Sequence, residues 1–249
     1  MKLNKIDPNG SKKLNKEETK AENIKLASKI IELQKIMRAE QKHSLLIILQ
    51  GMDASGKDGA VRSVFSGVNP EGVNVKSWKK PTEEEFAHDF LWRIHKHTPA
   101  KGMIQVFNRS HYEDILVPSV NGYIGKKKIE RRYDYINTFE KMLEDNGTKV
   151  LKFYLHISKD EQRERLQERL EIPRKFFKHG DGDWKVREQW DSYMSIYENI
   201  FDKCNDIPWH IVPSNKNWVK VNHIAKVVYN TMRELNPQWP ALETELFAK

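Results

Sequence analysis

The sequence predicts an α/β fold in which a parallel five-stranded sheet is flanked by helices. Five short apolar or alternating runs are separated by longer stretches with helical periodicity, and this alternation is typical of a parallel sheet covered on both faces. The chain has 249 residues, of which 38% are hydrophobic and 10% aromatic. That is enough apolar material to fill the core of one such domain.

The predicted strands are short and rich in β-branched, aromatic or leucine side chains. In chain order they are Ser44–Gln50, Val73–Trp78, Met103–Phe107, Lys149–Ile157 and Trp209–Val212. The predicted helices lie between and after them, at Asp58–Phe65, Glu83–Lys96, Ile129–Glu144, Lys159–Leu170, Arg187–Lys203 and Trp218–Leu235.

The N-terminal part precedes this alternation. Met1–Lys20 is polar and lysine-rich, and we expect a loose arm. Ala21–Gln41 has the apolar spacing of an amphipathic helix that packs on the domain, with an oligomer contact as the alternative use. Residues 1–41 are therefore expected to be an extension, and residues 42–249 one domain. Glu171–Lys185, rich in proline, glycine and charge, is either a mobile lid or an ordinary surface loop.

Composition limits the class of protein. The most apolar run, Leu45–Leu49, is too short to span a bilayer, and Met1–Asn9 lacks a signal-peptide core. The single cysteine, Cys204, excludes an internal disulfide framework and a zinc site made of several thiolates. We expect a cytoplasmic protein.

The charge balance favours a polyanionic partner. Lys and Arg number 43 against 35 Asp and Glu, which gives a formal net charge of +8. Nucleic acid, an anionic membrane and inorganic polyphosphate all satisfy this charge, and a merely basic surface is the alternative.

A phosphate-binding loop follows the first strand. Residues 51–59, GMDASGKDG, have the G-x-x-x-x-G-K spacing between a strand and a helix. Gly51 and Gly56 let several N–H groups converge on one anion, and Lys57 adds a full charge. The alternative is a glycine turn with an exposed lysine. The other loop residues expected to bind phosphate or nucleotide are Met52, Ala54, Ser55, Asp58 and Gly59.

Two carboxylates in this loop indicate a metal ion. Asp58 replaces the usual Ser or Thr after the lysine, and Asp53 lies inside the loop. Both would repel a phosphate unless a cation lay between them, and Mg²⁺ prefers oxygen ligands. Asp53 is the primary candidate ligand. Asp58 is the second, with a stabilising role in the first helical turn as its alternative.

Polar residues also follow the third strand, whose carboxyl end should face the same site. Arg109 can contact phosphoryl oxygens in a bidentate manner, and Asn108 and Ser110 can hold metal-bound water or the loop itself. Glu113 and Asp114 are weaker candidate metal ligands. For His111 we favour packing or hydrogen bonding, because transfer between phosphates needs little proton movement.

Several motifs in order resemble the polyphosphate kinase 2 family, from about Lys42 to Leu235. They are residues 51–59, Ser66–Val73, Ser77–Arg93, Phe107–Asp114 and the stretch Arg187–Tyr193, REQWDSY. The resemblance implies a thymidylate-kinase-like P-loop kinase core with a helical lid at about residues 160–190. It also implies transfer of a phosphoryl group between polyphosphate and a nucleotide with Mg²⁺, for which Mn²⁺ can substitute.

The resemblance also assigns residues. Asp53 and Lys57 match essential Walker A positions, and Arg109 matches a phosphate-contacting arginine. The lid residues are Lys175, Lys178 and Arg187, and with these matches the predicted catalytic set is Asp53, Lys57, Arg109 and Arg187. Arg62, Lys79 and Arg93 lie in or beside family motifs and are expected to line a polyphosphate channel. Asn108 replaces a common Asp, a pattern that resembles members accepting monophosphates as well as diphosphates.

The function predicted from the sequence is thus a phosphotransferase domain acting on polyphosphate and on ADP/ATP, GDP/GTP or AMP. We expect a homo-oligomer that binds neither nucleic acid nor membrane. The alternatives are an ATP-dependent nucleotide or small-metabolite kinase on the same core, and a P-loop module that binds nucleic acid or senses nucleotides without turnover.

Overall fold

A computed structural model describes residues 2–244, so Met1 and residues 245–249 of the predicted domain lie outside the described residues. Five strands form one parallel sheet in the order β2-β3-β1-β4-β5. The strands are β1 (Ser44–Gln50), β2 (Val73–Ser77), β3 (Ile104–Asn108), β4 (Thr148–His156) and β5 (Trp209–Pro213). The predicted α/β fold with a parallel five-stranded sheet is confirmed.

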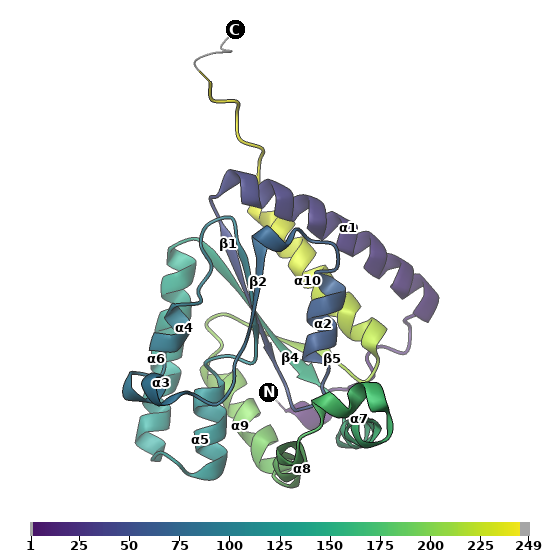
Figure 1. Cartoon of the computed structure of the whole chain (residues 1–249), viewed down its shortest axis with the longest axis vertical. Coiled ribbons are helices and arrows are strands. Elements are labelled where there is room, and N and C mark those ends of the chain that lie inside the picture. Colours follow the sequence, from purple (N-terminus) through teal and green to yellow (C-terminus); the bar gives the residue numbers. More distant parts are fainter. Residues whose placement is uncertain (1, 245–249) are drawn as a thin grey trace.

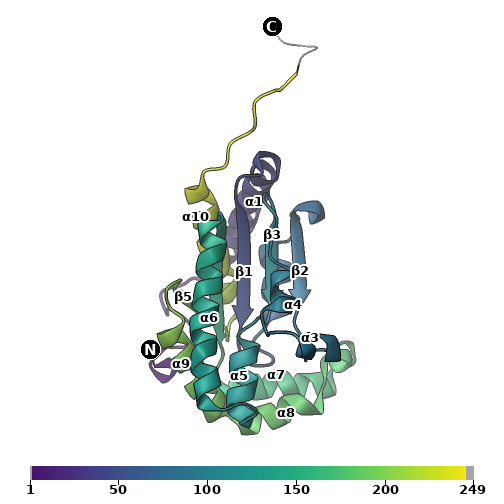
Figure 2. The same ribbon diagram turned by 90° about the vertical axis from the view of Figure 1, so that its left-hand side faces the viewer.

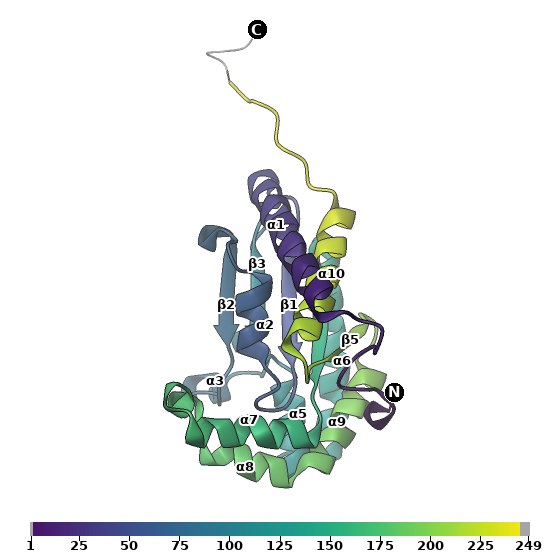
Figure 3. The same ribbon diagram turned by 90° about the vertical axis from the view of Figure 1, so that its right-hand side faces the viewer.

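Helices cover both faces of the sheet (Figures 1 to 3). One face carries α1 (Lys16–Glu40), α2 (Lys57–Val64) and α10 (Asn217–Leu235), and the other carries α5 (Glu113–Asn121), α6 (Lys126–Asp145) and α9 (Trp190–Lys203). The side chains of β1 alternate between two buried clusters, with Leu45, Ile47 and Leu49 in one and Leu46 and Ile48 in the other. This is why the strand is apolar throughout. No helix within residues 2–244 combines the length and the apolar character needed to cross a bilayer.

A further layer lies across the carboxyl ends of the strands (Figure 2). It consists of α7 (Lys159–Glu171), a 3₁₀ turn η3 (Pro173–Lys178) and α8 (Asp181–Glu188). These elements occupy the region expected to be the lid. Glu171–Lys185, read from the sequence as a lid or a loop, is therefore largely helical.

The N-terminal arm is anchored, contrary to the expectation of a loose segment. A 3₁₀ turn η1 (Leu3–Lys5) buries Leu3, whose N–H donates to Glu198 Oε1 at 2.8 Å. Further along, the carbonyl of Pro8 accepts from the N–H of Asn215 at 3.0 Å. Helix α1 begins at Lys16, where the Asn15 side chain caps it. These contacts are tertiary, so polar composition alone did not reveal them.

Other predicted elements differ locally. The single helix Glu83–Lys96 is two short helices, α3 (Glu83–Ala87) and α4 (Trp92–His95), because extended backbone at His88 separates them. Helix α5 was not predicted, and Pro118 inside it obscures the helical signal. A 3₁₀ turn, η2 (Pro70–Gly72), precedes β2. The predicted helix Arg187–Lys203 is divided between α8 and α9.

Candidate active site

The P-loop wraps around the ammonium group of Lys57. Gly56 has φ of +90° and Ala54 φ of +63°, so the backbone turns sharply between β1 and α2. Lys57 Nζ donates to the carbonyls of Gly51 at 2.8 Å and Met52 at 3.1 Å. Burial and the nearby Arg109 charge lower the pKa of Lys57 to about 8. An anion over the loop would offset both effects, so this geometry suits a phosphate.

A cleft of about 1030 Å³ lies over the P-loop, and we call it the main cleft. Its walls come from the P-loop, α2, the start of the loop after β2, the end of β3, α7, η3, α8 and α10. Eleven cationic residues line it: Lys57, Arg62, Lys79, Lys80, Arg109, Arg165, Arg169, Arg174, Lys175, Lys178 and Lys220. The acidic lining residues are Asp53, Asp58, Glu168 and Asp183. The excess of positive charge fits a long polyanion.

Arg109 connects the two sides of the site. It follows β3 with a left-handed φ of +64°, and its N–H donates to the Leu49 carbonyl at 3.0 Å. Its guanidinium forms an ion pair with Asp53 and lies 3.8 Å from Glu113 Oε2. Burial raises the pKa of Glu113, and the Glu113 charge raises the pKa of Arg109, which stays cationic. Arg109 can therefore stabilise negative charge on a phosphate group bound at this point of the site.

A second pocket of about 280 Å³, here called the side pocket, shares Asp53 and Arg109 with the main cleft. Its other lining residues come from the P-loop, α5, α8 and α9 and include apolar and aromatic side chains: Gly51, Met52, Glu113, Leu116, Val117, Asn121, Lys185, Val186, Gln189, Tyr193 and Tyr197. Two different ligands can thus meet at Asp53 and Arg109.

Two of the carboxylates predicted as metal ligands face the main cleft. Asp53 and Asp58 both line the main cleft, whereas Asp114 is held by Arg93 at 3.0 Å and lines neither pocket. Asp58 accepts a bond from Asn108 Nδ2 at 2.6 Å. Within the described part of the chain no cluster of three His, Cys, Asp or Glu side chains is arranged for a metal. The site therefore fits Mg²⁺ held by one or two carboxylates together with substrate phosphates, and Asp53 is the carboxylate shared by both pockets although it also pairs with Arg109.

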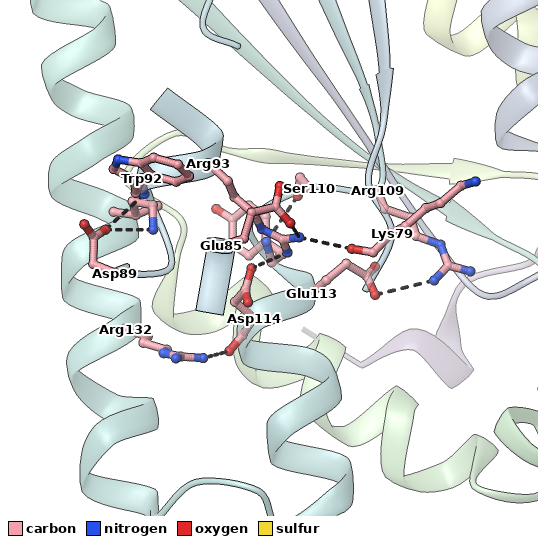
Figure 4. Close-up of polar contacts among 12 residues, drawn as sticks. Lys79, Glu85, Asp89, Trp92, Arg93, Arg109, Ser110, Glu113, Asp114 and Arg132 are labelled. Atoms are coloured by element: carbon pink, nitrogen blue, oxygen red, sulfur yellow. Dashed lines mark hydrogen bonds and ion pairs between the residues drawn. The ribbon is translucent and has the colours of Figure 1, made fainter. Parts of the chain in front are cut away.

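Besides Asp114 and the buried Ser55, two predicted site residues, Arg93 and Arg187, line neither pocket. Arg93 is 5% exposed, and it donates to the Lys79 carbonyl at 3.1 Å and to Asp114 (Figure 4). It holds the loop that carries Lys79 rather than lining the channel. Arg187 of α8 donates to Gln162 Oε1 at 3.0 Å, and Gln162 Nε2 donates to the Asp53 carbonyl at 3.0 Å. Arg187 thus joins the lid helices to the P-loop.

The other predicted residues are close together. Arg62, Lys79, Asn108, Lys175 and Lys178 all line the main cleft. In the P-loop, Ala54, Gly56, Asp58 and Gly59 line it as well, Gly51 and Met52 line the side pocket, and Ser55 is buried beneath. Lys178 of η3 lies 3.6 Å from Asp58 across the cleft.

Lys220 and Asp183 were missed as site residues. Both line the main cleft, and burial together with the Asp53 charge raises the pKa of Asp183. The sequence does indicate the position of Lys220, because it lies one helical turn before Ile224 and so falls on the buried face of α10. A lysine on an apolar face calls for a specific partner. Asp183, in a polar stretch, left no such signal.

Comparisons with known proteins agree with this geometry. The family model described as polyphosphate kinase 2 matches residues 13–239. The chain is 47% identical to an AMP/ADP-polyphosphate phosphotransferase of Meiothermus ruber, over 88% of this chain and 83% of that protein. It is 39% identical to an ADP-polyphosphate phosphotransferase of Rhodopseudomonas palustris, over 85% of this chain and 78% of the other.

Solved structures extend the comparison to the fold. The crystal structure of polyphosphate kinase 2 from Arthrobacter aurescens superposes with a TM-score of 0.95 at 40% identity, covering 98% of this chain and 89% of that one. The P-loop, the cationic main cleft and the match over most of the chain lead to one assignment: this chain belongs to the polyphosphate kinase 2 family.

Proposed function

We propose that this protein transfers a phosphoryl group between inorganic polyphosphate and a nucleoside diphosphate or monophosphate. The observation that carries the proposal is the meeting of two unlike pockets at Asp53 and Arg109. The main cleft has a volume of about 1030 Å³ and a cationic lining, which suits polyphosphate. The side pocket has aromatic and apolar walls, including Tyr193 and Val186, which suit a nucleoside.

In the proposed reaction, a terminal phosphate oxygen of the nucleotide attacks the end phosphorus of polyphosphate. A new P–O bond forms to the nucleotide, and the P–O–P bond to the remaining chain breaks, so the chain leaves one phosphate shorter. Lys57 and the P-loop amides hold the phosphates in line, and Arg109 offsets the charge on the transferred group. The attacking oxygen is already ionised, so no general base is required.

Mg²⁺, or Mn²⁺ in its place, is proposed as the cofactor, with Asp53 as its main protein ligand and Asp58 as the second. When bound, such an ion neutralises phosphate charge and orients donor and acceptor oxygens. Asp58 is already hydrogen-bonded to Asn108, which fixes the orientation of its carboxylate toward the cleft.

We propose both AMP and ADP as acceptors. The Meiothermus ruber relative, at 47% identity, is named for both nucleotides. Guanine nucleotides are proposed as further acceptors because apolar and aromatic walls, such as those of Val186 and Tyr193, can contact either purine ring. An ATP-dependent kinase is the reading that these comparisons do not favour.

The decisive experiment measures ATP formation from long-chain polyphosphate and Mg²⁺, with ADP and AMP supplied separately. Lys57→Ala is the matched inactive control, since it removes the ammonium group held in the P-loop. The proposal is supported if the wild-type enzyme forms ATP from ADP and Lys57→Ala does not. If the wild-type enzyme also forms ADP and ATP from AMP, AMP is a second acceptor. A folded enzyme that forms no ATP from either, but phosphorylates nucleotides with ATP as donor, would refute it.

The site of action is proposed to be the cytoplasm, supported by the single buried, unpaired thiol of Cys204. A homo-oligomer is also proposed. Ile24 of α1, which lies in the predicted amphipathic segment Ala21–Gln41, is 70% exposed and offers an apolar contact. Light scattering on the purified protein, repeated with Ile24→Glu, tests this assembly.

A further inference from the structure

Lys220 of α10 occupies an unusual position beneath the P-loop. It is 1% exposed and yet lines the main cleft. Helices α10 and α2 lie side by side (Figures 1 and 3). A Cβ added to Gly56 would lie 2.1 Å from Lys220 Nζ, so the ammonium group touches the residue that caps α2. Lys220 is therefore part of the wall against which a bound phosphate would rest.

The hydrogen bonds of the neighbouring cations differ from those of Lys220. Lys57 donates to two loop carbonyls. Arg165 uses its guanidinium on Glu161 and on the carbonyls of residues 54, 214 and 215. Lys220 Nζ donates to Asn217 Oδ1 at 2.8 Å, and within residues 2–244 no carboxylate forms an ion pair with it. Two of its three N–H donors thus remain for a ligand in the cleft.

The surroundings make the charge of Lys220 unfavourable in the free protein. Burial, then the charges of Arg165 on α7 and Lys57 on α2, lower the pKa of Lys220 to about 7, and Asp58 on α2 opposes them. A buried cation without an acidic partner costs folding free energy unless something compensates it. A polyanion in the cleft supplies that compensation, and a perturbed group in a cleft is a candidate for function.

We propose that Lys220 is a phosphate-binding residue of the polyphosphate site, contacting the chain where it passes over Gly56 toward α10. This inference rests on the proposed function and adds a direction for the chain within the main cleft. Because Lys220 does not line the side pocket, it serves polyphosphate rather than the nucleotide. Binding of the chain should then also protonate Lys220.

The test compares Lys220→Met with Lys226→Met, which removes the same charge from an exposed position on the same helix, where Lys226 pairs with Glu22. Polyphosphate binding is measured by calorimetry at pH 8 in buffers of different ionisation enthalpy, together with KM for ADP and urea unfolding. In Lys220→Met we expect polyphosphate affinity to fall about ten- to a hundredfold, because the variant loses a charge-assisted hydrogen bond to the chain. KM for ADP should change little, and proton uptake should fall by about one proton.

The free energy of unfolding of the Lys220→Met variant distinguishes a ligand-binding role of Lys220 from a structural one. A ligand-binding lysine replaced by an apolar side chain of similar length should leave urea unfolding unchanged or shifted upward, whereas Lys226→Met should behave like wild type in every assay. Wild-type polyphosphate affinity in Lys220→Met, with or without lost stability, overturns the proposal. If that variant does not fold, Lys220→Gln, which keeps a donor for Asn217, is subjected to the same criterion. Failure of the proposed function itself would appear separately, as a wild-type enzyme that forms no ATP.

Discussion

The buried pair of Lys152 on β4 and Glu140 on α6 provides a quantitative prediction about stability. Lys152 Nζ lies 2.7 Å from Glu140 Oε2, and both side chains are at most 1% exposed. Glu140 Oε1 also accepts from Tyr112 OH at 2.8 Å and lies 3.1 Å from His111 Nε2. The pair therefore anchors the turn that follows Arg109.

The perturbation is Glu140→Gln, which leaves the Lys152 ammonium group buried without a carboxylate. Breaking a buried pair from one side costs about 3–5 kcal/mol. Against a total stability of roughly 5–15 kcal/mol this is a large loss, equivalent to a fall in Tm of roughly 6–20 °C. The matched control is Glu130→Gln on the same helix, whose pair with Lys203 is exposed and should contribute less than about 1 kcal/mol.

The assay is urea unfolding as a function of pH. Burial alone would raise the pKa of Glu140, but the charge of Lys152 and the bond to His111 outweigh it and leave the pKa below its usual value. A lowered folded-state pKa means that Glu140 stabilises the protein above its unfolded-state pKa of about 4.3, and the contribution is lost as pH falls through the folded-state pKa. The difference between wild type and Glu140→Gln should thus be constant near neutral pH and shrink in acid.

A double-mutant cycle completes the test. Glu140→Gln with Lys152→Met removes both charges, so the double variant should be more stable than the sum of the single effects predicts, by at least about 1 kcal/mol. If Glu140→Gln unfolds within about 1 kcal/mol of wild type near pH 7, or if the two effects simply add, the pair does not act as this geometry implies.

Three further predictions concern the site. Gly56→Ala places a methyl group at a φ of +90° and 2.1 Å from Lys220 Nζ. The free energy of unfolding in urea should therefore fall by about 1–3 kcal/mol, and polyphosphate affinity should fall as well. A variant of wild-type stability would contradict this. Arg93→Lys replaces the planar guanidinium that donates to both the Lys79 carbonyl and Asp114 with a single ammonium group. KM for polyphosphate should therefore rise several-fold, while KM for ADP should stay unchanged. With eleven cations in the main cleft, log affinity for polyphosphate should fall steeply and linearly with log salt concentration, and an almost flat dependence in titrations would count against the cleft as its site.

The P-loop and the strands could be read from the sequence because both are local. Ser44–Gln50 was predicted with the bounds that β1 has, since a strand buried on both faces needs apolar residues throughout. Residues 51–57 carry the loop glycines and Lys57 in one contiguous motif. Asp53 and Arg109 were chosen separately, and the parallel register then brought their strand ends together, because β1 and β3 are neighbours.

Tertiary structure decided which cations face the ligand. Arg93, Arg187 and Lys220 all have long, flexible side chains, and the sequence places each near a motif or a helix face. Arg93 turns to Asp114, and Arg187 turns to Gln162, because those partners lie within reach only after folding. Lys220 enters the cleft because α10 packs beside α2. The direction of a cationic side chain depends on acids and carbonyls distant in sequence, and only the folded chain brings them together.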